Sequence, residues 1–333
     1  MRTAGVEVVE RHVAVWDGER EGWNAGPRAA ARLAAAELRL LARRERDDAD
    51  VVVVGYPGHF DLPAARRAAR GRPVVFNPLV SLADTFVSDR GRFGERSLAA
   101  RVLAQVDRRA FGAADLVVAD TGEHAAFFRR LTDTPVETCF VGAEDRVFRP
   151  GWSPGDDFTV LFVGKLIPLQ GVDVILDAAR AAPELRFRIV GSGQLGALVE
   201  QRPDNVEHVP WVDYRDLPGE LHRAGCALGI FGRSPKAARV IPNKAFQALA
   251  CATPLVTGDT PAARELLVDG ESAALIPVGD PETLAATLRR LAGDSALRRR
   301  LSDGGRRAYE LRASERVLGA RWRGLLERVV STA

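Results

Sequence analysis

Short apolar runs alternate along this chain with longer segments in which apolar residues recur at helical spacing. In the first half of the chain the short runs cover 51–54, 74–76, 116–119 and 136–141. Alternation of this kind is typical of parallel sheets whose strands are joined by crossover helices. The pattern therefore predicts an α/β fold.

A stretch rich in proline and glycine, residues 148–155, precedes a second series of strands and helices. Such a composition between two periodic regions indicates an interdomain linker. The strands of the second series are predicted at 160–163, 187–190, 206–209, 226–231, 255–257 and 273–276. We expect two doubly wound parallel-sheet domains, one over residues 1–150 and the other over residues 151–310.

From Pro281 onward the sequence is helical and rich in arginine. Leu284, Leu288 and Leu291 recur on one face, which predicts a helix that packs on that face and leaves its charges in solvent. Residues 311–333 are expected to form a C-terminal helix that packs back toward the first domain.

Composition excludes some classes of protein. A chain of 333 residues with 46% hydrophobic and 27% charged residues is not a disordered protein. A net charge of +3 gives little support to a nucleic-acid-binding protein. No stretch approaches the roughly 20 apolar residues of a membrane span, so we expect a cytoplasmic protein. Three widely spaced cysteines, Cys139, Cys226 and Cys251, suit small buried side chains better than disulfides or metal ligands.

A basic helix is predicted over 28–46. Its apolar stripe, Leu33, Leu40 and Leu41, fits packing on a sheet, and weak peripheral contact with anionic lipid stays open as an alternative. Across the whole chain the basic residues are almost all arginine, since only three of the 47 are lysine. Chance in a GC-rich gene explains this bias as well as a need for compact phosphate-binding ammonium groups does.

All three lysines, Lys165, Lys236 and Lys244, lie in segments that carry candidate chemistry. The strand at 160–163 is followed by a glycine-containing loop, residues 164–171, and then by a helix at 172–182. A loop at the carboxyl end of a parallel strand opens into the ligand crevice, and Lys165 would meet a phosphate there. In the second segment a helix begins near Asn243 or Lys244, just after Pro242. Its N-terminus predicts an anion site.

Lys236, Arg239 and Lys244 add positive charge at this helix start. A simple turn after the strand and a capped surface helix with solvated charges are the alternatives for the two segments.

At these segments the chain resembles glycosyltransferase family 4, a large family of retaining enzymes with the GT-B fold. The resemblance lies in the 164–173 loop, in Ile189-Val190-Gly191-Ser192-Gly193 and above all in residues 242–256, PNKAFQALACATPLV. In the first half, residues 114–121 and 141–150 are also similar. The resemblance implies two Rossmann-like domains facing a cleft, with a nucleotide-sugar donor held by the second domain and the acceptor by the first.

The resemblance also implies roles for single residues. Gly164 and Lys165 stand where the family binds donor phosphates, and Gln170 replaces a second basic ligand, for which Lys236 or Lys244 would compensate. Two further positions at which the family tends to carry glutamates read Arg239 and Gln247 here. Gln247 can bind a ribose hydroxyl, whereas Arg239 would pair with phosphate or a sugar carboxylate. The complete set of expected donor ligands is Gly164, Lys165, Gln170, Asp213, Lys236, Arg239, Asn243, Lys244 and Gln247.

Asp213 falls where the family meets the nucleotide base, and a turn or helix cap is the alternative there. We expect Lys165 and Arg239 to be the catalytic groups, because fixed positive charge can stabilise a leaving diphosphate without a metal. The single Asp-x-Asp, residues 48–50, precedes a strand, so no metal and no cofactor are expected. The donor would be a UDP- or GDP-sugar, and the reaction would retain anomeric configuration.

The first domain matches the family less well. It starts at residues 4–9, which look like the family's second strand, so the first βα unit is expected to be missing. Two segments, 56–61 and 77–89, follow predicted strands and supply the acceptor-side candidates His59, Asp84 and Asp89. A histidine after Pro-Gly is also a common turn residue.

The acceptor class stays open between a carbohydrate, a lipid-linked molecule and a small molecule. An inactive GT-B relative that binds a nucleotide-sugar or a partner is the main alternative function. A Rossmann oxidoreductase fits less well, since Gly191-Ser192-Gly193 lacks the third glycine and the acidic residue that follows at the expected spacing. A GT-B epimerase or phosphorylase is a third alternative. The sugar, the base and the oligomeric state are not determined by the sequence.

Overall fold

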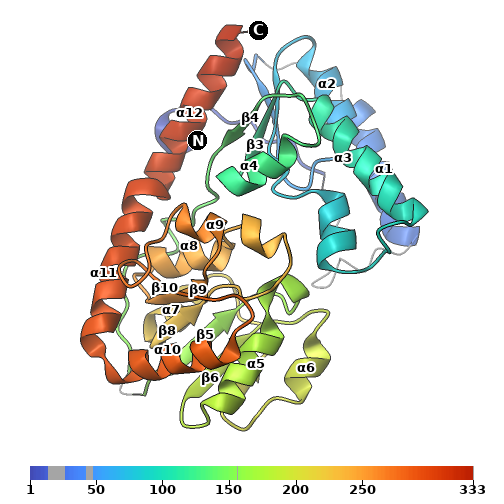
Figure 1. The fold of residues 1–333 in the computed structure, drawn as a ribbon. Coiled ribbons are helices and arrows are strands. Elements are labelled where there is room, and N and C mark those ends of the chain that lie inside the picture. Colours follow the sequence, from blue (N-terminus) through green and yellow to red (C-terminus); the bar gives the residue numbers. More distant parts are fainter. Residues whose placement is uncertain (14–26, 43–47, 156, 333) are drawn as a thin grey trace.

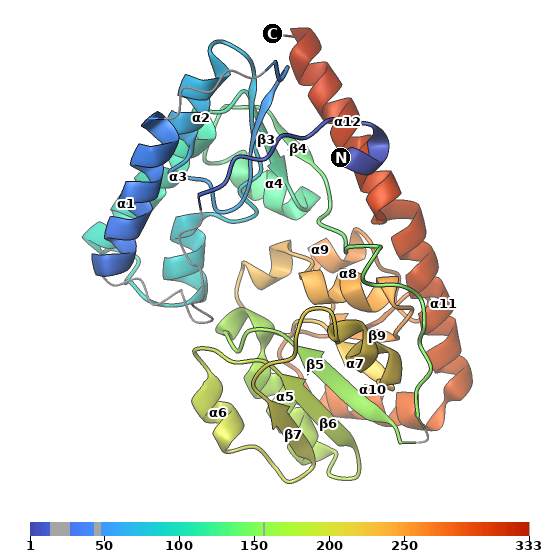
Figure 2. The same ribbon diagram turned by 180° about the vertical axis from the view of Figure 1, so that it is seen from behind.

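The computed structural model describes residues 1–13, 27–42, 48–155 and 157–332, and these residues form two parallel sheets (Figures 1 and 2). The first sheet contains β1 (Val52–Val54), β2 (Val74–Phe76), β3 (Leu116–Ala119) and β4 (Val136–Thr138). The second contains β5 (Thr159–Val163), β6 (Arg186–Val190), β7 (Val206–Val209), β8 (Cys226–Leu228), β9 (Leu255–Gly258) and β10 (Ala274–Ile276). Each strand lies within or beside an apolar run, so the predicted α/β class is confirmed.

Helices fill the segments between the strands. Those of the first half are α1 (Pro27–Ala42), α2 (Leu62–Ala69), α3 (Leu98–Gly112) and α4 (Gly122–Phe128), with the short 3-10 helix η1 (Arg2–Ala4) and the π-helical segment η2 (Asp84–Asp89). Those of the second half are η3 (Pro168–Gln170), α5 (Val172–Ala181), α6 (Gly196–Glu200), α7 (Leu217–Arg223), η4 (Ala237–Arg239), α8 (Asn243–Ala250), α9 (Pro261–Arg264) and α10 (Pro281–Gly293). The chain continues through α11 (Ser295–Arg312) and α12 (Glu315–Thr332).

The second sheet has the strand order β10-β9-β8-β5-β6-β7, with every neighbouring pair parallel. The order changes direction between β5 and β8, and in doubly wound sheets the ligand crevice opens at the carboxyl ends of the strands beside such a point. One face is covered by α5 and α10, whose Leu284, Leu288 and Leu291 are fully buried as predicted. The other face carries α7, α8 and α9.

The first sheet is built differently. Its strands follow one another in sequence order, β1-β2-β3-β4. Right-handed crossovers that all advance in one direction place their helices on a single face, and α2, α3 and α4 share one apolar cluster there. On the opposite face Leu325 and Leu326 of α12 are clustered with Val75 and Val118. The C-terminal helix, which runs along one side of the molecule, therefore forms the second layer of the first sheet (Figure 1).

The expected strand at residues 4–9 is not formed. The segment begins as η1 and continues without regular structure, and β1 is the outer strand of the first sheet as described. The segment at 4–9 instead contacts α12. Arg323 donates a hydrogen bond to the Ala4 carbonyl, and Val6 packs against the apolar cluster that contains Leu325 and Leu326. Packing on α12 thus covers the apolar side chain of Val6, which a neighbouring strand would cover if the segment joined the sheet.

Two other expectations concern helices and cysteines. The predicted basic helix ends as α1 at Ala42, and residues 43–46 of that prediction lie outside the described residues. Its apolar stripe is half-buried and α1 packs against α2. The three cysteines are buried and free. Among the described residues, no helix is both long enough and apolar enough to cross a membrane.

Candidate active site

Three glycine loops meet at the carboxyl edge of the second sheet. β5 ends at Val163, and the chain passes through Gly164 and η3 before α5 begins. A Cβ added to Gly191, which follows β6, would lie 1.9 Å from the Gly164 carbonyl oxygen. A Cβ on Gly171 would lie 2.7 Å from the backbone nitrogen of Gly232. Glycine is required at these positions because each loop touches the backbone of another, and the close packing leaves backbone groups at the edge where a ligand would approach.

Lys165 lies exposed on the first of these loops. Partial burial of the ammonium lowers its pKa, and the nearby guanidinium of Arg90 lowers it further. Arg90 belongs to the first domain, and its carbonyl accepts a hydrogen bond of 3.4 Å from the Gln194 side chain. Positive charge from both domains therefore converges beside the loop, which is the arrangement that an anionic ligand requires.

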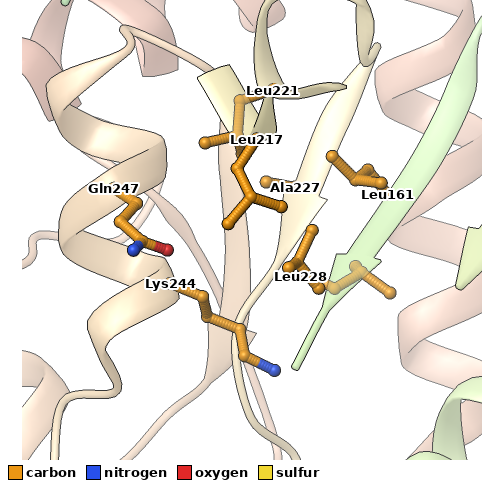
Figure 3. A pocket seen from close by; sticks show the side chains of 8 residues that line it. Leu161, Leu217, Leu221, Ala227, Leu228, Lys244 and Gln247 are labelled. Carbon is orange, nitrogen blue, oxygen red and sulfur yellow. The ribbon is translucent and has the colours of Figure 1, made fainter. Parts of the chain in front are cut away.

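Lys244 occupies a different environment from the one predicted. It is the second residue of α8, and its side chain extends from the helix toward the end of β5 (Figure 3). The ammonium is buried beneath Gly164, donates a hydrogen bond of 2.6 Å to Gln170 Oε1 and lies 3.5 Å from the centre of the Phe162 ring. Burial lowers its pKa well below the ordinary value of a lysine. The structure thus brings Lys244 and Gln170 together.

Farther along α8, Gln247 helps to line a cavity of about 10 Å³ together with Lys244 and leucines of the sheet and α7 (Figure 3). This volume corresponds to about one water molecule. Gln247 also bonds the hydroxyl of Tyr214, which is partly exposed. Asn243, the first residue of α8, is exposed beside this region.

Asp213 is exposed in the loop after β7. Its carboxylate accepts a hydrogen bond of 3.2 Å from the indole of Trp211. Its carbonyl accepts from the backbone nitrogens of Asp216 and Leu217, so the residue also forms a turn. An exposed tryptophan next to a carboxylate gives this loop both a flat apolar surface and a hydrogen-bond acceptor.

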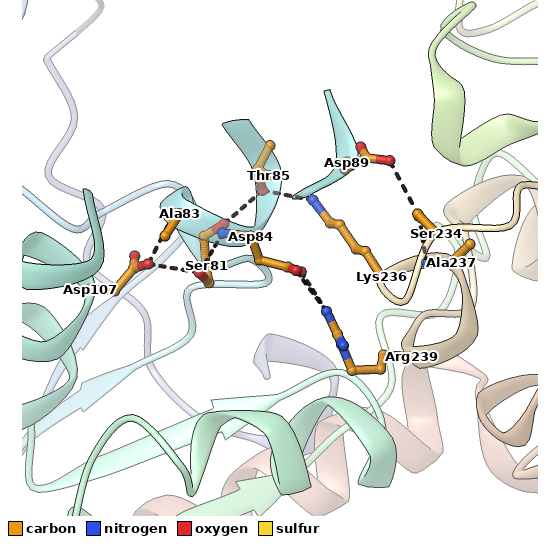
Figure 4. Close-up of polar contacts among 10 residues, drawn as sticks. All are labelled: Ser81, Ala83, Asp84, Thr85, Asp89, Asp107, Ser234, Lys236, Ala237 and Arg239. Atoms are coloured by element: carbon orange, nitrogen blue, oxygen red, sulfur yellow. Dashed lines mark hydrogen bonds and ion pairs between the residues drawn. The ribbon is translucent and has the colours of Figure 1, made fainter. Parts of the chain in front are cut away.

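The remaining donor-side cations face the first domain (Figure 4). Arg239 Nη2 lies 2.7 Å and 2.8 Å from the two carboxylate oxygens of Asp84, and the guanidinium stacks on the Phe127 ring at 4.3 Å. Lys236 Nζ donates a hydrogen bond of 2.7 Å to the Thr85 hydroxyl. Asp84 and Thr85 both belong to η2, and π-helical turns of this kind concentrate at functional sites. We call the contact between η2 and residues 234–239 the interdomain lock.

The lock is largely shielded from solvent. Only 17% of the Arg239 side chain and 4% of the Asp84 side chain are exposed. Burial lowers the pKa of Lys236 although Asp89 and Asp84 oppose the change, and burial raises the pKa of Asp89 although Lys236 opposes it. For both groups desolvation outweighs the attraction of the opposite charge. Arg239 is paired with Asp84 in this structure, and its expected pairing with phosphate stays a prediction.

A second contact joins the domains beside the lock. The Glu265 carboxylate accepts hydrogen bonds of 2.7 Å and 2.9 Å from the backbone nitrogens of Gly122 and Glu123 at the start of α4. The Thr121 hydroxyl donates to the Arg239 carbonyl. The two bonds of Glu265 satisfy backbone N–H groups that the first turn of α4 leaves without partners.

His59 does not lie in an open crevice as expected. Its side chain is 0% exposed, its ring is 5.2 Å from that of Phe76, and Nε2 is 3.2 Å from the Asp107 carboxylate. Asp107 also accepts from the Ser81 hydroxyl and from the backbone nitrogens of Leu82 and Ala83. The aromatic neighbours draw His59 into the core, where with Asp107 it supports the segment that leads into η2.

Sequence reasoning missed several of these residues. No sequence motif marks Arg90, Asp107 or Glu265. Each of them contacts residues that are distant in the sequence. Arg90 lies one residue beyond a segment that was singled out because it follows a strand, so a wider window would have included it. In the described part of the chain, no group of three or more histidine, cysteine or acidic side chains could hold a metal ion.

Comparison with known proteins places these features in context. Residues 157–294 match the sequence model of a family described as Glycosyl transferases group 1. Phosphatidyl-myo-inositol mannosyltransferase of Mycobacterium leprae is 33% identical over 160 residues, which is 45% of this chain and 41% of that protein. The match thus spans less than half the length of this curated relative.

Solved structures resemble the chain over a greater length. Sucrose-phosphate synthase from Thermosynechococcus elongatus superposes with a TM-score of 0.73 at 16% identity, covering 93% of this chain and 83% of the other. The Anabaena protein HepE in complex with UDP-glucose superposes with a TM-score of 0.67 at 16% identity, covering 85% and 79%. At such identities the likeness concerns the fold alone, which is the GT-B arrangement.

Proposed function

Residues 157–294 belong to the glycosyl transferases group 1, and from this premise we propose that the protein transfers a sugar from a nucleotide-diphosphate donor to an acceptor, with retention of anomeric configuration. The observation that carries the proposal is the convergence of Gly164, Gly191 and the N-terminus of α8 at one sheet edge, with Lys165 beside them. Backbone N–H groups and a helix N-terminus form an anion site, and a diphosphate has the matching charge.

Catalysis would rest on fixed positive charge. As the bond between the sugar and the diphosphate breaks, negative charge builds up on the leaving oxygen. Lys165, with Arg90 across the domain boundary, would stabilise that charge without having to reorganise. The acceptor hydroxyl would attack from the same face and lose its proton as the new bond forms. The enzyme would need no metal ion for this step.

The nucleoside would extend along α8 toward the loop after β7. Gln247 offers an amide to a ribose hydroxyl, and Asp213 with the exposed Trp211 offers an acceptor and a stacking surface to the base. HepE is described in complex with UDP-glucose, which supports a UDP-sugar as the first donor to test, followed by a GDP-sugar. A lipid-linked acceptor is suggested by the name of the mycobacterial relative, and a carbohydrate or other small molecule would be tested beside it.

Calorimetric titration with UDP, GDP, TDP and NAD tests the proposal. We expect one nucleoside diphosphate to bind, NAD not to bind, and Lys165→Ala to weaken binding at least tenfold, or about 1.4 kcal/mol. Arg290→Ala is the matched control, because this exposed cation lies on α10, which covers the face of the sheet opposite α8. A folded protein that binds none of the diphosphates contradicts the proposal.

A second candidate function is binding without turnover. The lock favours it, since Arg239 stands at a position where the family tends to carry a glutamate and is paired with Asp84. Incubation with a bound donor and a panel of acceptors separates the two functions. Release of nucleoside diphosphate coupled to a glycosylated product supports transfer, whereas tight binding with no release supports a binding protein.

A further inference from the structure

Lys244 is a buried amine that has no acidic partner in the described part of the chain. Its Nζ has one hydrogen-bond acceptor, the neutral amide oxygen of Gln170, and one aromatic face, that of Phe162. A charged ammonium has three N–H donors and is costly to bury unless it is paired and hydrogen-bonded. No carboxylate pairs with it among the residues that the structure describes. These surroundings therefore disfavour the charged form of this side chain, and burial lowers its pKa well below the ordinary value.

The amine lies where an anion would arrive. A Cβ on Gly164 would come within 2.6 Å of Lys244 Nζ, so the absence of a side chain at this glycine makes room for the amine beneath the loop. Lys244 is also in the first turn of α8, where the backbone N–H groups point out of the helix. A diphosphate seated on the Gly164 loop would thus bring to Lys244 a negative charge that none of its described neighbours supplies, together with further acceptors.

The other charged and titratable groups around Lys244 do not supply a negative charge to its amine. Lys165, on the loop above it, is another cation and faces Arg90. His208 binds the Gly191 carbonyl at 2.8 Å behind the neighbouring loop. Farther along α8, Tyr214 and Glu144 interact with each other beside Gln247. Lys236 of the interdomain lock is already opposed by Asp89 and Asp84. Among the described groups near the loop, Lys244 is the buried lysine that has no acidic partner.

We propose that Lys244 is held uncharged beneath the Gly164 loop while the site is empty, and that it takes up one proton from solvent when the donor diphosphate binds. The proton balance is simple, because the neutral amine becomes an ammonium and the bound diphosphate keeps its full charge. This inference rests on the proposed function, since it presupposes that the diphosphate binds at this loop. It gives the chain a second phosphate cation in place of the basic residue that Gln170 replaces.

Calorimetry in two buffers measures the uptake directly. UDP and GDP are titrated at one mildly alkaline pH in buffers with high and low ionisation enthalpy, and the difference in observed heat gives the number of protons taken up per nucleotide. The terminal phosphate is already ionised at that pH because its second pKa is about 6, so protons do not come from the ligand. We expect uptake of a substantial fraction of one proton, falling to zero in Lys244→Met with at least a tenfold loss of affinity.

Lys165→Met is the matched control. It removes an exposed lysine of the same loop, so affinity should fall while proton uptake remains. Circular dichroism spectra of both variants establish that they are folded, and methionine suits the apolar surroundings of position 244. Nucleotide binding with no proton uptake in the wild type, or with uptake unchanged in Lys244→Met, overturns this inference and leaves the proposed function intact. Absence of nucleotide binding overturns the proposed function itself.

Discussion

Replacing Asp84 with asparagine tests the contact that holds the two domains together. In the wild type one Arg239 nitrogen donates to both Asp84 oxygens, and both side chains are largely buried. Asparagine keeps the size of the side chain but removes its charge. The Arg239 guanidinium would then lie between the domains with the Phe127 ring and a neutral amide oxygen as neighbours, and its Nε has no hydrogen-bond partner among the described residues.

The size of the effect follows from this geometry. Removing one partner of a buried ion pair costs about 3–5 kcal/mol, because the other charge is left uncompensated. Since Arg239 keeps 17% exposure and can turn toward solvent, we expect about 1.5–3 kcal/mol, which is the range for hydrogen bonds to charged groups. Arg239→Gln in the same background should then cost little more, because the carboxylate is already gone.

Urea unfolding of the wild type, both single variants and the double variant gives the coupling energy. The exposed pair of Arg264 and Asp259 is the matched control, with side chains 58% and 31% exposed and the same type of contact. Exposed pairs couple by about 0.2–1 kcal/mol. Small-angle scattering of the double variant should show a larger radius of gyration. A coupling energy for Asp84 and Arg239 no larger than that of the control pair would refute the reasoning.

Three further predictions concern stability and the loops. Burial and the nearby Asp61 carboxylate raise the pKa of Glu37 from 4.5 to about 8, so its stabilising contribution is complete below pH 4.5 and is lost as the pH rises toward 8. Thermal melting should show that Glu37→Gln removes this fall; an equal fall in the variant contradicts it. Gly191→Ala places a Cβ 1.9 Å from the Gly164 carbonyl, so nucleotide affinity should drop sharply in calorimetry while a helical spectrum remains; unchanged affinity would show that the loops tolerate displacement. Leu326→Ala removes a buried contact between α12 and the first sheet and should cost about 2–5 kcal/mol in urea unfolding, and a cost below about 1 kcal/mol would mean that α12 adds little to that domain.

The sequence predicted the family and the local structure more readily than it predicted the roles of individual residues. The string at 242–256 carries the resemblance to the family. It also predicts the start of α8, because proline before a helix and the apolar period within it are local signals. The glycine loop at Gly164 was likewise found from its place after a strand. The roles of single residues in that loop and helix stay predictions until a ligand is measured.

Charge partners could not be predicted in the same way. Asp84 and Arg239 lie 155 positions apart, and Lys244 and Gln170 lie 74 positions apart. Nothing near either member of a pair in the sequence specifies the other. His59 gives the same lesson, since its turn sequence favours the surface whereas Phe76 and Asp107 draw it inside.

The sequence by itself determined where the strands and most helices lie, because the period of apolar residues is imposed by backbone geometry within a few residues. It also predicted the glycine-containing loop that follows the strand at 160–163. Only the tertiary structure decided that α12 covers the first sheet, that Arg239 is bound to Asp84 and that Lys244 is buried with no acidic partner among the residues described. The reason is physical: the state of a charge depends on its solvent exposure and on neighbours from distant parts of the chain, and both arise only when the sheets and helices pack together.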